Sequence, residues 1–228
     1  MSETSQSDPI LMFAHDLRQP LRSIMMQAQR IQRQGDGLND EARTRLAEIV
    51  AAARKQDELI ASFVEYDQAG GVETQGGSML PVRLAIQTAC MKLEAYRKSC
   101  EAVIRFDASF APTTVAPVGL TKVIERVLHN ALKFRRPDSA PVVAIEASTN
   151  ESGMCVVRIE DDGIGIEPQY WSTVFEPFRR LNSPVLYPGC GLGLATCRKQ
   201  LAAMGGTIEV EDGALLSGVA MVISFPCR

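Results

Sequence analysis

The sequence predicts an α+β protein: a helical hairpin that pairs into a dimeric four-helix bundle, followed by a two-layer α/β sandwich. Three observations predict this fold class. Apolar residues recur at alternating spacings of four and three as far as residue 63, four glycines fall within residues 68–77, and short apolar runs beyond them alternate with helical patterns. A chain of 228 residues, 46% hydrophobic and 22% charged, is long enough for two globular domains. We therefore expect domains at 1–67 and 78–228, joined by a flexible linker at 68–77.

The first domain is predicted to be two amphipathic helices. The first heptad seam consists of Ile10, Ala14, Leu17, Leu21, Ile24, Ala28 and Ile31. Gly35–Asp40 breaks this helix, and either Asn39 or Asp40 is placed to cap the next one. The second seam consists of Ala42, Leu46, Ile49, Ala53, Gln56, Ile60 and Phe63. One hairpin cannot bury both stripes fully, so we expect a homodimer; the alternative is packing of the hairpin on its own C-terminal domain.

The second domain is predicted to alternate between helices and strands. Helices are expected at Val82–Ser99, at Val118–Phe134 before Pro137, and at Gly191–Met204 before Gly205 and Gly206. Strands are expected at Ala102–Asp107, Val142–Ala147, Cys155–Glu160, Thr207–Glu211 and Val219–Phe225. Antiparallel runs of strands, with the helices gathered separately, favour a two-layer sandwich.

Bulk properties exclude several classes of function. A net charge of -3 gives no electrostatic reason to expect binding to nucleic acid or to an anionic membrane. The sequence has no apolar run long enough for a transmembrane helix and no secretion signal at Met1–Asp8. The six cysteines are scattered, which predicts reduced thiols and a cytoplasmic location. Zinc binding is disfavoured because His15 and His129 are far apart and flank no cysteines.

A possible phosphoryl acceptor lies in the first helix, in the segment His15-Asp16-Leu17-Arg18-Gln19-Pro20-Leu21-Arg22. His15 is one residue from the seam, so its imidazole should be partly exposed and nucleophilic near neutral pH. Asp16 could accept a hydrogen bond from one ring nitrogen and leave the other free to attack. Pro20 inside the helix predicts a kink near this site. A lone His-Asp pair would more often be an incidental surface feature.

Three later motifs offer the parts of a nucleotide site: Asn130–Phe134, Asp161–Gly165 and Gly189–Leu194. Lys133 can reach a phosphate, Phe134 can cover a base, and a buried Asp161 can accept from the adenine amino group. Glycines at the start of a helix let backbone amides converge on phosphates. Taken singly, the motifs could equally be a helix terminus, an acidic hairpin turn and a glycine-rich helix cap.

The order and spacing of the four motifs resemble the kinase core of bacterial two-component sensor histidine kinases, from about Ile10 to Phe225. The residues of the first two motifs resemble most closely those of the phytochrome-like branch of this family. The resemblance implies catalytic roles for His15 and Asp16, a Mg²⁺ ligand in Asn130, and a mobile lid at Tyr170–Pro184. The nucleotide-binding residues that it implies are Asn130, Lys133, Phe134, Asp161, Gly163, Gly165, Ile166, Arg179, Gly189, Gly191, Leu192 and Gly193. Two positions depart from the family pattern, because Arg126 and Asp162 stand where asparagine is usual.

The motifs together predict an ATP-dependent protein-histidine kinase that uses Mg²⁺. It would autophosphorylate on His15 and pass the phosphoryl group to an aspartate of a response-regulator receiver domain. The input would come from a sensor protein in trans, or from a sensor missing from this chain. The alternatives are a non-catalytic phosphotransfer protein with a degenerate nucleotide domain, and a stand-alone ATPase or serine kinase of the same superfamily.

Overall fold

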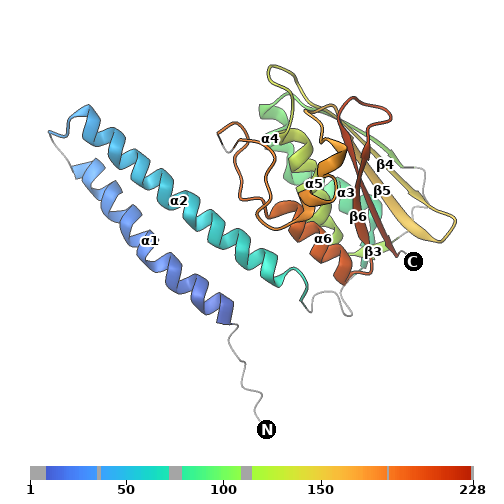
Figure 1. Ribbon diagram of the computed structural model, residues 1–228, viewed down its shortest axis with the longest axis horizontal. Helices are drawn as coiled ribbons and strands as arrows, with labels where there is room; N and C mark the ends of the chain where they lie inside the picture. The colour runs from blue at the N-terminus through green and yellow to red at the C-terminus, as the bar shows by residue number, and fades with distance from the viewer. Residues whose placement is uncertain (1–8, 35–36, 72–78, 109–114, 184, 227–228) are drawn as a thin grey trace, which may run out of the picture. The chain divides into compact units, whose positions relative to one another are not determined.

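The structure is a computed structural model that describes residues 9–34, 37–71, 79–108, 115–183 and 185–226. The chain divides into two compact units, Met1–Gln68 and Ala69–Arg228, each with its own packing (Figure 1). Residues 72–77 of the predicted linker lie outside the described part of the chain.

The first unit is a hairpin of two long helices, α1 (Pro9–Gln34) and α2 (Asp40–Gln68), which pack side by side (Figure 1). Of the two expected caps, Asn39 is the one used: its Oδ1 accepts a hydrogen bond of 2.8 Å from the amide of Ala42. This bond satisfies one of the free donors at the start of α2. Pro20 lies within α1, as predicted.

The predicted heptad seam divides into an inner and an outer row. On α1, Ala14 and Ala28 are buried within the hairpin, whereas Leu17, Ile24 and Ile31 remain 40%, 48% and 48% exposed. On α2, Ala53 is buried, but Ile49 and Phe63 of the predicted seam are exposed. The other two buried residues of α2, Val50 and Val64, each lie one position later than the seam residue predicted. One hairpin therefore leaves five of the predicted apolar seam residues exposed: Leu17, Ile24, Ile31, Ile49 and Phe63.

The second unit is built on a five-stranded sheet with the strand order β2-β4-β5-β7-β6. The strands are β2 (Val103–Ala108), β4 (Val142–Thr149), β5 (Met154–Asp161), β6 (Thr207–Asp212) and β7 (Val219–Pro226). The expectation of antiparallel strands is wrong for one pair, since β2 and β4 run parallel. A parallel pair needs a long crossover, and the segment between these strands contains the helix α5 (Leu120–Lys133).

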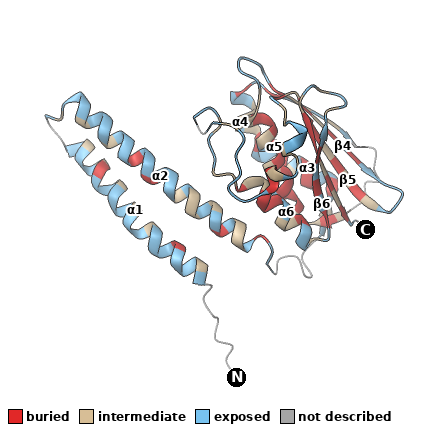
Figure 2. Ribbon diagram, viewed as in Figure 1, coloured by how far each residue is buried: buried red, intermediate tan, exposed pale blue. Residues whose placement is uncertain are grey.

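Helices cover one face of this sheet: α3 (Val82–Lys92), α5 and α6 (Gly193–Ala203) (Figure 1). The core lies between the two layers and is the densest region of buried residues in Figure 2. The other face of β6 is exposed at alternate positions, including Thr207 and Glu209. The predicted two-layer α/β sandwich is confirmed.

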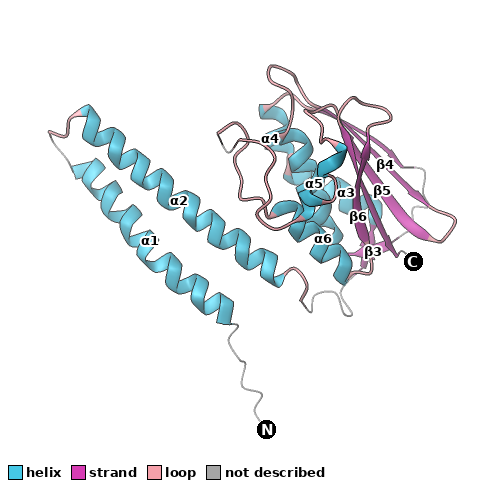
Figure 3. Cartoon of the chain, in the orientation of Figure 1, coloured by secondary structure: helices cyan, strands magenta, loops and turns pink. Residues whose placement is uncertain are grey.

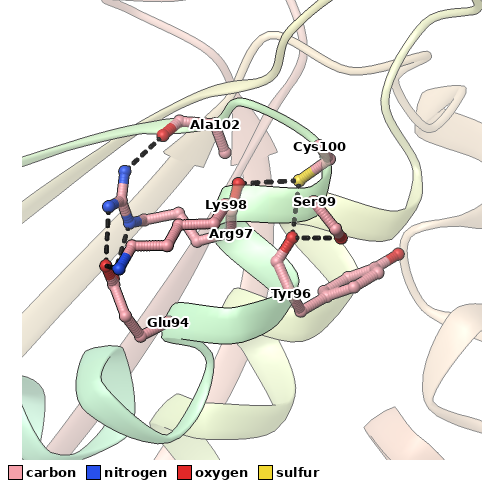
Figure 4. Close-up of polar contacts among 7 residues, drawn as sticks. All are labelled: Glu94, Tyr96, Arg97, Lys98, Ser99, Cys100 and Ala102. Carbon is pink, nitrogen blue, oxygen red and sulfur yellow. Dashed lines mark hydrogen bonds and ion pairs between the residues drawn. The ribbon is translucent and has the colours of Figure 1, made fainter.

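The single helix predicted at Val82–Ser99 is in fact two, α3 and α4 (Glu94–Ser99), with the break at the buried Leu93. No glycine or proline marks this break in the sequence. Figure 4 shows how α4 is fixed: Arg97 pairs with Glu94 at 2.7 Å and donates to the carbonyl of Ala102 at 2.9 Å. These contacts hold α4 to the start of β2.

A second, two-stranded sheet was not expected. Its strands, β1 (Met79–Pro81) and β3 (Val115–Pro117), are antiparallel and three residues long each, which is too short to show a pattern in the sequence. A long connection between β5 and α6 carries the short 3₁₀ helices η2 (Pro168–Tyr170) and η3 (Thr173–Phe175) (Figure 3). This connection holds the expected lid.

Candidate functional site

The expected phosphoryl acceptor, His15, lies on α1 and is well exposed, with 64% of its side chain accessible. Its Nδ1 is 3.6 Å from Oδ1 of Asp16, which is 77% exposed. This distance is too long for a hydrogen bond, but a small rotation of either side chain would form one. The buried neighbour Ala14 fixes His15 beside the seam rather than in it, as the heptad spacing predicts.

One helical turn from His15, an ion pair crosses the hairpin. Arg18 Nε on α1 lies 3.2 Å from Oδ1 of Asp57 on α2, and both side chains are partly buried. Charged groups in an apolar seam favour one alignment of two helices over others, because any slip would leave each charge unpaired. The pair therefore favours this register of the hairpin close to the acceptor.

In the second unit, the end of α5 meets the turn that follows β5. The amide of Ile164 donates to the carbonyl of Phe134 at 3.0 Å. A Cβ on Gly163 would lie 2.5 Å from the same carbonyl oxygen and 2.8 Å from Oδ1 of Asp161. Only glycine allows so close an approach of the two segments. The second and third motifs are therefore brought together by backbone contact.

Asp161 ends β5 and is buried, with 8% of its surface exposed. Burial raises the pKa of its carboxyl group to about 6, although amide hydrogen bonds from Gly163 and Val219 act in the opposite direction. The bond from Gly163 to Oδ1 measures 2.9 Å. At neutral pH the group is still an anionic acceptor, held by fixed donors in an enclosed site. These are the properties that recognition of an amino group on a base requires.

Asp162 has a different place. Its Oδ1 accepts from the amide of Val142 at 2.9 Å, and its own amide donates to the carbonyl of Val142 at 3.2 Å. The carboxylate thus caps the start of β4. The asparagine that is usual in the family would also have an acceptor oxygen for the Val142 amide. Aspartate and asparagine at this position can therefore form the same cap.

Lys133 and the glycine-rich motif lie together. The Lys133 ammonium is 4.6 Å from the centre of the Phe134 ring, and a Cβ on Gly189 would lie 3.0 Å from the Nζ atom. Burial lowers the pKa of Lys133, and the neighbouring guanidinium of Arg180 adds to this effect. The other neighbour of Phe134 is Tyr187, whose ring centre is 5.1 Å away. The site thus combines a cation, two aromatic rings and glycine backbone.

Gly191 brings the lid onto the glycine-rich motif. Its φ is +76°, and a Cβ would lie 2.7 Å from the carbonyl oxygen of Arg179 and 2.8 Å from the carbonyl carbon of Phe178. Arg180 donates to the carbonyl of Tyr187 at 3.0 Å. Leu192 is buried and Gly193 begins α6. The amides at the start of α6 therefore lie next to the backbone of Phe178 and Arg179, which only a glycine at position 191 can approach so closely.

The beginning of the lid is also anchored. Trp171 Nε1 donates to the carbonyl of Ile166 at 2.9 Å, and Ile166 packs on the core. Gly165, with φ of +78°, turns the chain just before it. Of the two phenylalanines in the lid, Phe175 is buried and Phe178 is 57% exposed. Trp171 and Phe175 therefore both anchor this segment on the core.

Asn130 lies one turn before Phe134 on α5 and is half-buried. Within the described residues, no three His, Cys, Asp or Glu side chains gather into a metal site. The side-chain oxygen of Asn130 fits Mg²⁺, a hard ion that often takes one or two protein oxygens together with nucleotide phosphates and water. Arg126 lies one turn before Asn130 and is also half-buried, so a cation adjoins the expected ligand.

Several residues of this site escaped the sequence reasoning, namely Tyr187, Arg136, Glu160 and Gly218. Tyr187 also donates from its hydroxyl to the carbonyl of Arg135 at 3.1 Å. Gly218 lies against Asp161, because a Cβ there would collide with both the carbonyl and Oδ1 of that residue. The glycines of the 213–218 segment were the only signal in the sequence that could have pointed to such an approach.

Each of the two compact units matches a known family model. Residues 115–228 match the family model of the histidine kinase-, DNA gyrase B- and HSP90-like ATPases, and residues 10–71 match the model of the His Kinase A phospho-acceptor domain. The chain therefore belongs to the two-component sensor histidine kinases, of which it contains the kinase core.

Known proteins agree with this assignment. The chain is 27% identical to the phytochrome-like protein Cph1 of Synechocystis sp. and 30% identical to cyanobacterial phytochrome A of Nostoc sp., in each case over 87% of this chain and 26% of the relative. The chain thus spans about a quarter of these relatives. The crystal structure of full-length ShkA in complex with AMPPNP superimposes with a TM-score of 0.72, at 23% identity, over 96% of this chain and 45% of ShkA. This likeness confirms the fold. Among the described residues, no helix is long and apolar enough to cross a membrane.

Proposed function

We propose that the chain is an ATP-dependent protein-histidine kinase that phosphorylates His15 and passes the phosphoryl group to an aspartate of a response-regulator receiver domain. One observation carries the proposal. Lys133, Phe134, Asp161 and the glycine-rich motif converge on one site, in a chain that also presents an exposed histidine on a helical hairpin.

In this proposal each part of the site has one task. The Asp161 carboxylate accepts from the amino group of adenine, while Phe134 and Tyr187 cover the base. Lys133 and the amides at the start of α6 bind the phosphates, since a helix N-terminus carries partial positive charge. Asn130 would hold Mg²⁺ through its side-chain oxygen. When bound, that ion neutralises phosphate charge and orients the triphosphate.

The chemical step is an in-line displacement. One imidazole nitrogen of His15 forms a bond to the γ-phosphorus, and the bond from that phosphorus to the bridging oxygen breaks, so ADP leaves with the electron pair. Asp16 is placed to hydrogen-bond the other nitrogen and to accept the proton that His15 loses. The guanidinium of Arg179 or Arg180 would offset negative charge as the lid closes.

The hairpin supplies the dimer and the docking surface in this proposal. Its outer row of exposed apolar residues is Leu17, Ile24, Ile31, Ile49 and Phe63. A second hairpin would bury this row and complete a four-helix bundle. A receiver domain would then dock beside His15. Input would come from a separate sensor protein, or from parts of a longer protein that this chain does not include.

Incubation of the purified chain with γ-labelled ATP tests the proposal and separates it from its two alternatives. A kinase of this type gives a protein label that is stable in alkali and lost in acid, because a phosphoramidate is acid-labile. A phosphotransfer protein with a degenerate nucleotide domain would take no label from ATP. A serine kinase or a plain ATPase would give an acid-stable label or free phosphate alone, and either result would contradict the proposal.

A further inference from the structure

Glu160 is a buried charge that the proposed phosphoryl transfer does not use. It precedes Asp161 on β5 and is 1% exposed. Its Oε1 accepts hydrogen bonds from the amides of Leu215, at 2.6 Å, and Leu216. Its Oε2 lies 3.3 Å from Nε of Arg158. An apolar residue would fill this place at lower desolvation cost, so a carboxylate here points to the amides that it binds.

These amides belong to the connection between β6 and β7, residues 213–218, which we call the β6–β7 loop. Burial by itself would raise the pKa of Glu160, but hydrogen bonds from the backbone of Leu216, Leu215 and Ala214, together with Arg158, outweigh burial and lower it. The carboxylate is therefore ionised at neutral pH. It fixes the backbone of a loop whose Leu215 side chain is itself exposed.

Arg136 holds the same loop from another side. Its Nη2 donates to the Oγ of Ser217 at 3.0 Å and lies 3.3 Å from the Ser217 carbonyl. Its Nε donates to the carbonyl of Gly163 at 3.2 Å. One guanidinium thus ties the β6–β7 loop to the turn that follows Asp161. The planar fork of arginine suits such a bridge between two backbone segments.

Between these two anchors, the loop contacts the carboxylate of Asp161 directly. The amide of Gly218 donates to the Asp161 backbone carbonyl at 3.0 Å. The amide of Val219 donates to the Asp161 carboxylate. Gly218 is packed so closely that a Cβ would collide with Oδ1 of Asp161. The position of the loop therefore determines which directions around the carboxylate remain open to a ligand.

We propose that Glu160 and Arg136 are positioning residues for adenine recognition, because together they hold the β6–β7 loop against the Asp161 carboxylate. This inference rests on the proposed function, in which Asp161 reads the base. Neither residue touches the nucleotide. Their effect is to keep Asp161 enclosed and fixed in orientation, so that it accepts from the amino group of adenine and rejects the carbonyl oxygen at the same position of guanine.

The test compares wild type, Glu160→Ala, Glu160→Gln and Arg136→Ala in the full chain. ATP and GTP affinities are measured by calorimetry, and amide exchange of residues 214–219 by mass spectrometry. We expect Glu160→Ala to lower ATP affinity roughly tenfold and GTP affinity less. The ratio of ATP affinity to GTP affinity should therefore fall. Amide exchange in the loop should accelerate. Glu160→Gln keeps an acceptor oxygen and should restore most of the preference.

Arg136 is exposed, so its alanine variant should fold even if Glu160→Ala does not, and it should narrow the preference in the same direction. Glu209→Ala is the matched control, since Glu209 is exposed on β6 of the same sheet. A loop that exchanges faster while the ATP-to-GTP ratio stays at the wild-type value would overturn the inference and leave the proposed function intact. Wild-type protein that binds no ATP would overturn both.

Discussion

The buried carboxylate of Asp161 is in a position that favours binding over stability. Its pKa of about 6 lies above the ordinary value of 3.8, because burial disfavours the charged form. In the proposed function, Asp161 needs that charged form to accept a hydrogen bond from adenine. The carboxyl group must therefore be ionised for this role, although its burial in the folded protein favours the neutral form.

Asp161→Asn should weaken ATP binding strongly. The side chain loses its charge and gains a donor, so a charge-assisted hydrogen bond to the adenine amino group is lost, with a cost of roughly 1.5–3 kcal/mol. Calorimetric titration with ATP measures this loss. Asp162→Asn is the control, because Asp162 caps β4 and should affect affinity little. Equal affinities of the two variants would remove Asp161 from the site.

The pH dependence follows from the direction of the shift. The folded protein holds the Asp161 proton more tightly than the unfolded chain, so stability is lost as the pH rises from about 4 to about 6. Relative to Asp161→Asn, the wild-type protein without nucleotide should be less stable at pH 7.5 than at pH 4.5, by roughly 1–3 kcal/mol. Urea denaturation at both pH values measures the difference. ATP affinity should change in the opposite sense, falling below pH 6.

Several residues of the site could be predicted from the sequence and others could not. Lys133, Phe134, Asp161 and the glycines stand in motifs whose chemistry is legible from residue type and spacing. Tyr187, Arg136 and Glu160 act through contacts with segments that are distant in the sequence: Arg136 meets Ser217, and Glu160 meets the amides of Leu215 and Leu216. No local sequence pattern predicts such contacts, because they form only when the sheet brings these segments together.

At the scale of elements, heptad periodicity predicted both helices of the hairpin, since 3.6-residue geometry dictates where apolar residues must recur. The break at Leu93 and the parallel pairing of β2 with β4 were not predictable in this way. The parallel pairing joins segments about 39 residues apart, such as Val103 and Val142, and no local pattern reports it. Periodicity locates the apolar face of a helix to within about one residue, as Ile49 and Val50 of α2 show, but it does not show which neighbour covers that face.

Gly163→Ala tests the backbone contact between α5 and the turn after β5. A Cβ would lie 2.5 Å from the Phe134 carbonyl oxygen, which is backbone and cannot move aside. We expect ATP affinity to fall roughly tenfold or more, with a stability loss of about 1–3 kcal/mol. Gly119→Ala is the matched control at the start of α5, where the new Cβ would meet only the Met204 sulfur at 3.5 Å. Similar affinities for both variants would contradict this account of the site.

The outer row of the hairpin predicts a dimer that single substitutions can break. Ile24→Glu places a charge in that row and should convert a dimer into a monomer in sedimentation analysis, because a second hairpin could no longer bury the position. Ser23→Glu should remain dimeric, since Ser23 shares its heptad position with the exposed Asp16 and Arg30. A wild-type monomer with a folded hairpin would rule out the bundle.

At the scale of the whole molecule, the chain consists of two compact units with different proposed roles. The first presents an exposed imidazole, and the second holds the proposed nucleotide site. In the proposed function these two units perform one reaction, in which the γ-phosphoryl group of ATP is transferred to His15.

Phosphate incorporation by His15→Gln, measured beside its ATP affinity, tests this proposed transfer most directly. We expect the variant to bind ATP with wild-type affinity, since His15 lies outside the compact unit that forms the site, and to incorporate no acid-labile phosphate. Phosphopeptide mapping of the wild-type protein should place the label on His15. Undiminished labelling of His15→Gln would show that another residue is the acceptor and would contradict the account.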